Sequence, residues 1–365
     1  MGDEWLMVRI AHISDSHLGC SLFQLVERRE DARRSLKKAI DMAMQHSPDI
    51  LVHTGDLFHS YMPQNDDMNF VVGLFKGLKD KTMLIVLQGN HDQPYGYRYS
   101  LSPLRQLETM DLIVSTGDQP NVSMVETLDG KKVEIHLVSW APSHVMNHII
   151  NNTTPDEEIA LFFAHDIDIM KENLPMHFNY YGCGHKHNYF MDEEYDIGRP
   201  GSTCIVNWNK EMGGNKRLIV VDIDSKGNEY TLQTLNDVRE FKFLTGLDIT
   251  GMGSEEINVK MRESLGKLSP KKSKPIIIMQ VNGMIDTETE KSIDRSKILK
   301  DYENKLDPLF VHIEPNWQCF GPRKVTLSRP LDVKQSILEY MSQTKDSLSS
   351  KIIERLPALL GGDSS

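Results

Sequence analysis

The sequence predicts an α/β protein followed by a smaller α+β unit, and two observations lead to this prediction. Over the first 235 residues, short apolar runs of strand length alternate with stretches that have helical periodicity. The composition then changes: residues 1–239 hold 22 basic and 34 acidic residues with 13 histidines, whereas residues 240–365 hold 19 basic and 18 acidic residues with one histidine. An acidic, histidine-rich unit followed by a nearly neutral one indicates two domains of different chemistry.

The first unit reads as helices placed between strands. From Glu30 to Gln45, apolar residues recur at helical spacing. Pro48 disfavours helical backbone at the residue before it, so this helix is expected to end near Ser47. Apolar runs predict strands at residues 9–14, 50–53, 83–88, 135–140, 161–164, 180–183 and 218–223.

The second unit is expected to begin near residues 236–245. Its pattern predicts a helix at 254–268, a strand at 276–281, a helix at 287–304 and a strand at 309–313. We therefore expect three parts: residues 1–238, residues 239–330 and a helical segment at 331–365. The apolar side chains of the last segment either pack on their own domain or dock a partner, and the sequence favours neither.

Composition excludes several classes of protein. Hydrophobic residues make up 39% and charged residues 25%, a globular balance that excludes wholesale disorder. No apolar run approaches the ~18 residues that a membrane-spanning helix needs. The four cysteines are spread singly, which argues against a disulfide framework and a cysteine zinc site. With no basic region leading into an apolar stretch at the start, we expect a soluble cytoplasmic protein.

Side chains that can bind metal recur directly after the predicted strands. They are Asp15-Ser-His17, Gly55-Asp56, Gly89-Asn90-His91-Asp92, His165 and Gly184-His185-Lys186-His187. The carboxyl ends of strands in α/β sheets form the binding crevice, so groups that are distant in sequence can converge there. One such group alone is usually a solvated or satisfied polar residue, but five in this order are hard to explain by chance.

The chemistry of these groups predicts a pair of metal ions. Carboxylates, an amide and imidazoles without cysteine suit borderline divalent ions such as Mn²⁺, Fe²⁺ or Zn²⁺. The set is too large for one ion and suits two ions that share a bridging carboxylate. Because such pairs clamp the attacking and leaving oxygens of an in-line displacement, we expect hydrolysis of a phosphate ester.

The order D-x-H, GD, GNHD, a lone His and GHxH resembles the signature of calcineurin-like metallophosphoesterases, which implies a β-sandwich flanked by helices. Residues 12–19 (HISDSHLG), 55–60 (GDLFHS, with Pro63 after it) and 89–92 (GNHD) resemble the Mre-eleven nuclease family, whose bacterial counterpart is SbcD. Tyr180-Tyr181 before GHxH, and RPGST at 199–203 with Trp208 after it, are similar to the same family. The resemblance extends more loosely over 240–330, where the family carries a capping domain.

The resemblance implies roles for individual residues. One ion would be bound by Asp15, His17, Asp56 and His187, and Asp56 would bridge to a second ion held by Asn90, His165 and His185. His91 would contact the scissile phosphate and help the leaving oxygen to depart, with Asp92 either orienting His91 or serving the turn. His59 matches the position that contacts DNA at the active site, which favours the archaeal and eukaryotic branch. Among divalent ions, the resemblance implies Mn²⁺ first.

DNA binding by an acidic chain requires local positive charge. The two ions would supply part of it. The basic residues that could extend it are Lys186, Arg199, Lys210, Lys216 and Arg217, with Lys271, Lys272 and Lys274 from the cap. Any one of these is more often a solvated surface charge. The sequence departs from the family directly after His165, where it has Asp166-Ile167 and family members often have a Gln-Gly pair.

The resemblance implies a Mn²⁺-dependent nuclease of double-strand-break repair, with 3′–5′ exonuclease activity on duplex ends and endonuclease activity. It also implies a homodimer through helices around 64–78 and 100–109, although periodicity alone allows these helices to pack on their own sheet instead. The implied partner is an SbcC-like coiled-coil ABC ATPase, and the implied location is the nucleoid. Two alternatives stay open: a phosphatase or phosphodiesterase of the same fold that acts on a smaller substrate, and a DNA-end tethering scaffold with little turnover. The lack of a Val-Asp-Arg-Gly type segment after Asp56 disfavours a phosphoprotein phosphatase, and the full ligand set disfavours a scaffold.

Overall fold

The computed structural model describes residues 7–320, except residues 95–100, 118, 129, 169–170, 213, 225, 237, 269–273 and 294–305. The chain separates into two compact units, Met1–Arg239 and Glu240–Ser365. The expected boundary after residue 238 lies beside this division. The predicted segment 331–365 and the end of the predicted helix 287–304 lie outside the described residues.

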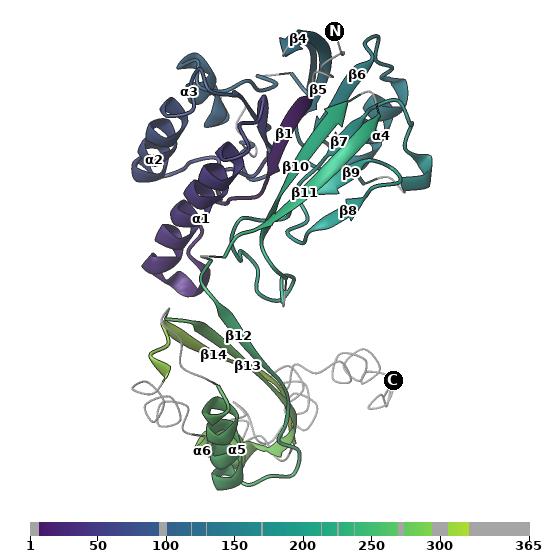
Figure 1. The fold of residues 1–365 in the computed structure, drawn as a ribbon. Coiled ribbons are helices and arrows are strands. Elements are labelled where there is room, and N and C mark those ends of the chain that lie inside the picture. The colour runs from purple at the N-terminus through teal and green to yellow at the C-terminus, as the bar shows by residue number, and fades with distance from the viewer. Residues whose placement is uncertain are drawn as a thin grey trace, which may run out of the picture. The chain divides into compact units, whose positions relative to one another are not determined.

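Unit 1 contains two β-sheets (Figure 1). The first has the order β11-β10-β1-β2-β3, in which β1, β2 and β3 are parallel, β10 is antiparallel to β1, and β11 is antiparallel to β10. Its strands are β1 (Val8–Ile13), β2 (Ile50–His53), β3 (Met83–Val86), β10 (Arg217–Asp224) and β11 (Gly227–Thr234).

The second sheet has the order β4-β5-β6-β7-β9-β8. Strands β5, β6, β7 and β9 are parallel, and the edge strands β4 and β8 run antiparallel to their neighbours. The bounds are β4 (Asn121–Leu128), β5 (Lys131–Val138), β6 (Ile159–Ala164), β7 (Tyr180–Gly182), β8 (Phe190–Asp192) and β9 (Ile197–Arg199).

The two sheets share an apolar core, which makes unit 1 a β-sandwich. Successive side chains of a strand point to opposite faces. Ile10 of β1 therefore packs with Ile135 and Leu161 of the second sheet, whereas Ala11 and Ile13 face the helices. Because both faces are covered, β1 reads as an apolar run in the sequence. The predicted sandwich flanked by helices is confirmed.

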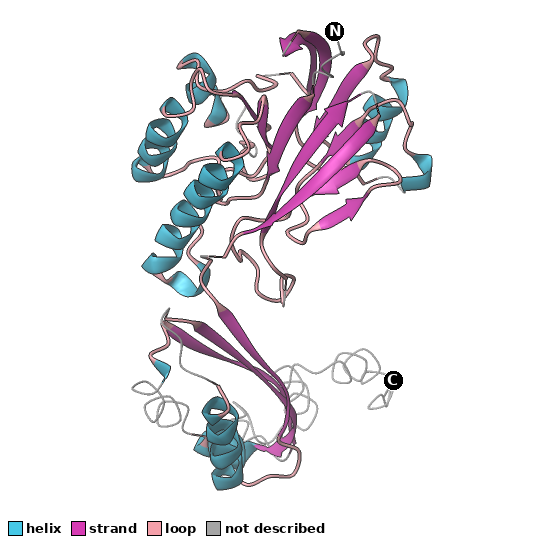
Figure 2. Cartoon of the chain, in the orientation of Figure 1, coloured by secondary structure: helices cyan, strands magenta, loops and turns pink. Residues whose placement is uncertain are grey.

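Helices cover the outer faces of both sheets (Figures 1 and 2). Helices α1 (Val26–Met44), α2 (Asn65–Lys76) and α3 (Leu104–Thr109) pack on the first sheet, and α4 (Ser143–Asn152) packs on the second. Helix α1 begins four residues before the apolar periodicity predicts. Its first turns bury Arg28 and Asp31 as an ion pair of 2.7 Å, and a pattern of apolar residues does not reveal such a pair.

The strands that the sequence analysis did not predict are β4, β8, β9, β11 and β12. Strands β4 and β11 largely alternate exposed and half-buried residues, so they contain no apolar run. Strands β8 and β9 have three residues each, which is too short for a periodicity to emerge. Helix α4 was also not predicted, and it buries only Met146 and Ile150.

Unit 2 is a three-stranded sheet with helices against it (Figure 2). Strands β12 (Phe241–Asp248), β13 (Ile276–Asp286) and β14 (Phe310–Phe320) are all parallel, with β13 in the centre. Parallel strands need crossover connections, and α5 (Ser254–Gly266) and α6 (Thr287–Ser292) lie in them. Among the described residues of both units, no helix is long and apolar enough to cross a membrane.

Candidate metal centre

The loops after β1, β2, β3, β6 and β7 carry the seven predicted metal ligands. The first two loops are joined through their backbones, because Asp15 N donates to Gly55 O at 3.0 Å and His17 N donates to Asp56 O at 3.0 Å. β1 and β2 are parallel neighbours, so their following loops leave the sheet at the same edge. The fold thereby brings together residues that lie far apart in the sequence.

Four of the seven predicted ligands have a left-handed backbone. The φ angle is 51° at Asp15, 44° at His17, 54° at Asp56 and 66° at His185. This conformation costs a residue with a β-carbon on the order of 1–3 kcal/mol, and it persists only where the surrounding structure enforces it. Residues held in this way cluster at ligand sites, so the strain itself points to a functional constraint here.

Two motif glycines are required because other residues approach them closely. A β-carbon at Gly89 would lie 2.1 Å from Oδ1 of Asp56, and one at Gly184 would lie 2.2 Å from Oγ of Ser14 and 3.0 Å from Oδ2 of Asp15. Real β-carbons do not come this close to other atoms. The glycines of GNHD and GHxH therefore leave room for the acids of the neighbouring loops.

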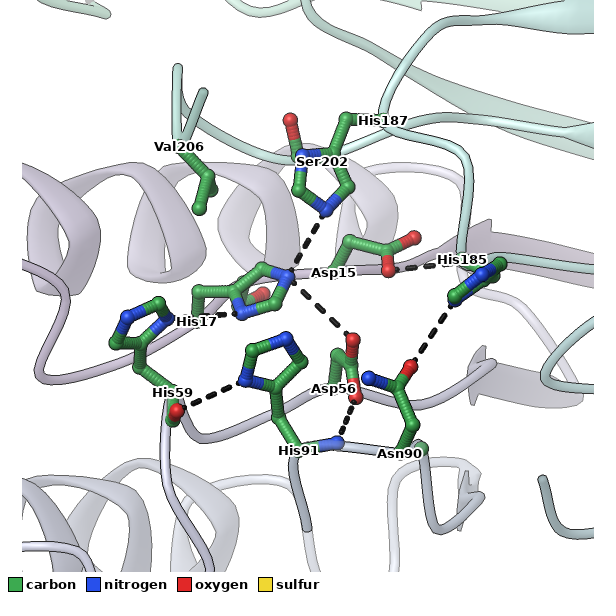
Figure 3. A network of polar contacts seen from close by, with 12 residues as sticks. Asp15, His17, Asp56, His59, Asn90, His91, His185, His187, Ser202 and Val206 are labelled. Atoms are coloured by element: carbon green, nitrogen blue, oxygen red, sulfur yellow. Dashed lines mark hydrogen bonds and ion pairs between the residues drawn. The ribbon is translucent and has the colours of Figure 1, made fainter. Parts of the chain in front are cut away.

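Among the described residues, three groups of possible metal ligands lie in this region, and two of them, called clusters below, adjoin at Asp56 (Figure 3). The third group consists of His17, His59 and His91. Within each cluster the ligand atoms lie within 4.8 Å of one another; one consists of Asp15, His17 and His187, the other of Asp56, His165 and His185. Oδ2 of Asp56 lies 3.5 Å from Nε2 of His17 and 3.5 Å from Nε2 of His165. A single carboxylate oxygen thus faces an imidazole of each cluster, as a bridging ligand would.

Asn90 belongs to the second cluster. Its Oδ1 lies 3.1 Å from Nε2 of His165 and 3.0 Å from Nδ1 of His185. The backbone amide of the next residue, His91, donates to Oδ1 of Asp56 at 2.8 Å, which also holds the GNHD loop against the bridging acid. All seven predicted ligands therefore lie in one place.

The surroundings of these groups fit metal cations. Oδ2 of Asp15 is buried and has no hydrogen-bond partner in the described part of the chain, as expected of an oxygen that binds a metal ion. Burial raises the pKa of Asp15 and lowers that of His17, because each charged form loses its hydration. At His165 burial lowers the pKa, but the carboxylates of Asp56 and Asp15 outweigh it and raise the pKa to about 9. Positive charge is thus favoured between these acids.

His91 and His59 lie beside the first cluster and are half-buried. Nδ1 of His91 donates to the carbonyl oxygen of His59 at 3.0 Å, and the two rings stack with centroids 5.2 Å apart. The ring of His91 also meets that of His17 edge-on at 4.8 Å (Figure 3). Both imidazoles therefore lie directly against His17 of the first cluster.

Asp92 joins two of the loops that carry the predicted ligands. It is fully buried, with Oδ1 accepting from Phe58 N at 2.9 Å and Oδ2 accepting from Gly89 N at 3.0 Å and from Leu57 N at 3.2 Å. It therefore ties the loop after β2 to the loop after β3. The expected bond from Asp92 to His91 is not among these contacts, because backbone amides occupy its carboxylate and Nδ1 of His91 bonds to a carbonyl oxygen instead.

Sequence reasoning missed Glu211. Its Oε1 accepts a hydrogen bond of 2.9 Å from Nδ1 of His187, one of the predicted ligands. Burial raises the pKa of Glu211, but His187 and Lys216 outweigh it and lower the pKa to about 2, so this buried acid is charged. It follows no predicted strand and belongs to no metal-binding pattern, so the sequence carried no signal for it.

The basic residues proposed for DNA contact differ in their surroundings. Lys186 and Lys210 are exposed. Nε of Arg199 donates to Asn188 O at 3.0 Å, and Arg217 lies over the ring of Tyr189. Lys216 does not face solvent, because it is buried against Glu211. Lys271 and Lys272 lie outside the described residues, and Lys274 pairs with Asp307 at 3.4 Å.

Comparison with known proteins identifies the class that this fold and these clusters define. Residues 8–206 match the model of the calcineurin-like phosphoesterase family, and the chain belongs to that family. The family has a dinuclear metal site, and the two adjoining clusters contain the His and Asp side chains for it. The chain is a metal-dependent phosphodiesterase.

The relatives narrow the class further. The chain is similar to proteins named DNA double-strand break repair protein Mre11 from three archaea. That of Sulfurisphaera tokodaii is 27% identical over 95% of this chain and 93% of its own length, and that of Methanocaldococcus jannaschii is 24% identical over 91% and 89%. That of Thermoplasma acidophilum is 25% identical over 76% and 78%. The resemblance to the Mre-eleven family that the motifs predicted is confirmed.

Proposed function

We propose that this chain is a DNA nuclease that processes double-strand breaks, with two Mn²⁺ ions as its cofactors. The observation that carries the proposal is the pair of clusters that share Asp56, in a chain aligned over nearly all its length with relatives named for break repair. The expected activities are 3′–5′ exonuclease action on duplex ends and endonuclease action. Mn²⁺ is favoured because carboxylate, amide and imidazole donors together suit a borderline ion.

The residues would divide the work as follows. Asp15, His17 and His187 would hold one cation, Asn90, His165 and His185 the other, and Asp56 would contact both. When bound, the two cations supply charge that neutralises the phosphate and activates water for in-line attack. His91 would donate a hydrogen bond or proton to the oxygen that leaves, a role that its half-buried imidazole against His17 of the first cluster supports. His59, stacked on His91, would position the DNA strand.

DNA would bind through phosphate contacts around the clusters. Lys186 and Lys210 are exposed; Lys186 lies between the ligands His185 and His187, and Lys210 precedes Glu211, whose carboxylate bonds to His187, so they are the first candidates on unit 1. Unit 2 would act as a capping domain that contacts DNA, with Lys271 and Lys272 as candidates. Since each phosphate contact releases counterions, binding would weaken steeply as salt is added.

Two protein partners complete the proposal. A second copy of this chain would pack against α2 and α3, where Tyr61, Met68 and Met110 line a pocket of about 560 Å³. Met62, Leu101 and Met110 are exposed at that pocket by 68%, 64% and 51%, an apolar patch of the kind that marks an interface. The other partner would be an SbcC-like coiled-coil ABC ATPase, docked on the segment 331–365.

Cleavage of DNA tests this proposal. An end-labelled linear duplex is incubated with Mn²⁺, with Mg²⁺ or with a chelator, beside bis(p-nitrophenyl) phosphate. We expect shortening from 3′ ends that requires Mn²⁺ and that falls by at least ~100-fold in His91→Asn, as for loss of a general acid. His144→Asn, at an exposed position of α4, is the control and should cleave as the parent does.

The alternatives give different results in the same assay. Hydrolysis of the small diester without action on DNA would indicate a phosphoesterase for smaller substrates. DNA binding without turnover of either substrate would indicate a tethering scaffold. Either result contradicts the proposed nuclease.

A further inference from the structure

Glu211 stands behind the metal ligand His187 and bonds to the ring nitrogen that faces away from the clusters. Nδ1 of His187 lies 2.9 Å from Oε1 of Glu211. On the other side of the ring, Nε2 lies 3.1 Å from Nε2 of His17 (Figure 3). An ionised carboxylate only accepts hydrogen bonds, so Nδ1 must carry the hydrogen. Nε2 of His187 is then left with its lone pair directed into the first cluster.

The carboxylate itself is held rigidly. It is fully buried, and Oε1 also accepts from Asn207 N at 2.6 Å and from Val206 N at 3.0 Å. Oε2 accepts from the ammonium of Lys216 and lies 2.8 Å from Oγ of Ser202. Lys216 is itself 6% exposed and balances the buried charge. This network leaves Glu211 no freedom to turn away from His187.

We propose that Glu211 is a positioning residue that fixes the tautomer and orientation of His187 and thereby raises the affinity of the first cluster for its cation. Carboxylates behind ligating histidines do this by making the imidazole more basic. The ligand His165 has a weaker partner, since its Nδ1 faces the carbonyl oxygen of Thr54 at 2.7 Å. Glu211 therefore acts on one of the two cations and not on both. The inference rests on the proposed metal centre.

The chain offers a matched control for this residue. Glu134 is also a buried acid, with Oε1 2.6 Å from Nε2 of His136. It accepts from two backbone amides as well, those of Asp156 at 2.6 Å and Glu157 at 3.1 Å. His136 is in neither cluster of possible ligands. Loss of either carboxylate removes a buried bond to a histidine and bonds to two backbone amides, but only loss of Glu211 should affect the metal.

The test is Mn²⁺ binding to the whole chain, measured by the loss of the electron paramagnetic resonance signal of free Mn²⁺. The parent should bind two equivalents. In Glu211→Gln one equivalent should bind about 10- to 100-fold more weakly, while the other is unchanged and Glu134→Gln binds as the parent does. Because a buried lysine left without its partner can prevent folding, Glu211→Gln with Lys216→Met is measured too and should show the same loss.

The outcomes separate this inference from the proposed nuclease. Parent-like binding in folded Glu211→Gln, or equal weakening in both glutamate variants, would overturn the role of Glu211. A parent that binds two equivalents of Mn²⁺ without cleaving DNA would overturn the proposed nuclease. The Mn²⁺ affinities of the glutamate variants would still decide the role of Glu211.

Discussion

At the scale of single residues, the close contact between Gly89 and Asp56 holds the bridging acid in place. A β-carbon at position 89 would meet Oδ1 and the backbone nitrogen of Asp56 at 2.1 and 2.3 Å. Because Asp56 faces both clusters, a displacement of this acid disturbs both cations. Misplacement of a catalytic group by about 1 Å can cost on the order of 100-fold in rate.

Gly89→Ala should therefore lower phosphodiesterase activity at saturating Mn²⁺ by about 100-fold or more, while the chain stays folded. Gly73→Ala is the matched control. It lies within α2, and nothing comes within 4 Å of a β-carbon built there, so it should keep full activity and gain stability of about 0.5–1 kcal/mol. Rates with bis(p-nitrophenyl) phosphate and thermal melting check both variants. Full activity in Gly89→Ala would contradict the role given to this contact.

The sequence predicted the residues of the clusters but not the polar contacts that support them. Asp15, His17 and Asp56 follow apolar runs within recognisable motifs, so their convergence could be expected from strand ends alone. Glu211 lies in an irregular loop, and its bond to His187 exists only once the chain has folded. The sequence singled out Asp92 but not its bonds to Phe58 and Gly89, which cross from one loop to the next. Long-range polar contacts leave no periodic trace in a sequence.

At the scale of elements, α2 and α3 form the surface proposed for the homodimer. Met110→Glu places a charge within its apolar patch, and the twofold symmetry of a homodimer brings two such charges into one interface. We expect the parent to be a dimer and this variant to be a monomer by light scattering at the same concentration. The volume and lining of the pocket support an interface here.

Val125→Glu is the control for that experiment. Val125 lies on the edge strand β4 and is 51% exposed, as Met110 is, but it is not part of the pocket at α2 and α3. It should stay dimeric. A parent that is monomeric, or a dimer that survives Met110→Glu, would contradict the proposed interface.

The sequence predicted the positions of those helices and strands that have a strong apolar pattern. Strands β2 and β6 and helix α5 agree with their predicted positions to within two residues. Strand β13 runs on to Asp286, beyond the predicted end at 281, because its last residues are half polar and are held by pairing with β14. Pairing with neighbours defines such strands, and it is invisible in a single sequence.

At the scale of the whole molecule, a negatively charged chain must bind a negatively charged phosphodiester. The two clusters explain how this repulsion is overcome. The net charge of −11 repels nucleic acid at long range. Bound cations reverse the local field where Asp15, Asp56 and the imidazoles meet. The likeness to archaeal Mre11 proteins over most of the chain agrees with this centre, which the proposed nuclease requires.

The most direct test of the account is anomalous diffraction at the manganese edge from crystals of the chain soaked in MnCl₂. The account predicts two peaks, one in contact with Asp15 and His187 and the other with Asn90 and His185, and both in contact with Asp56. A single peak, or peaks that do not touch Asp56, would contradict the shared two-cation centre on which the proposed function rests.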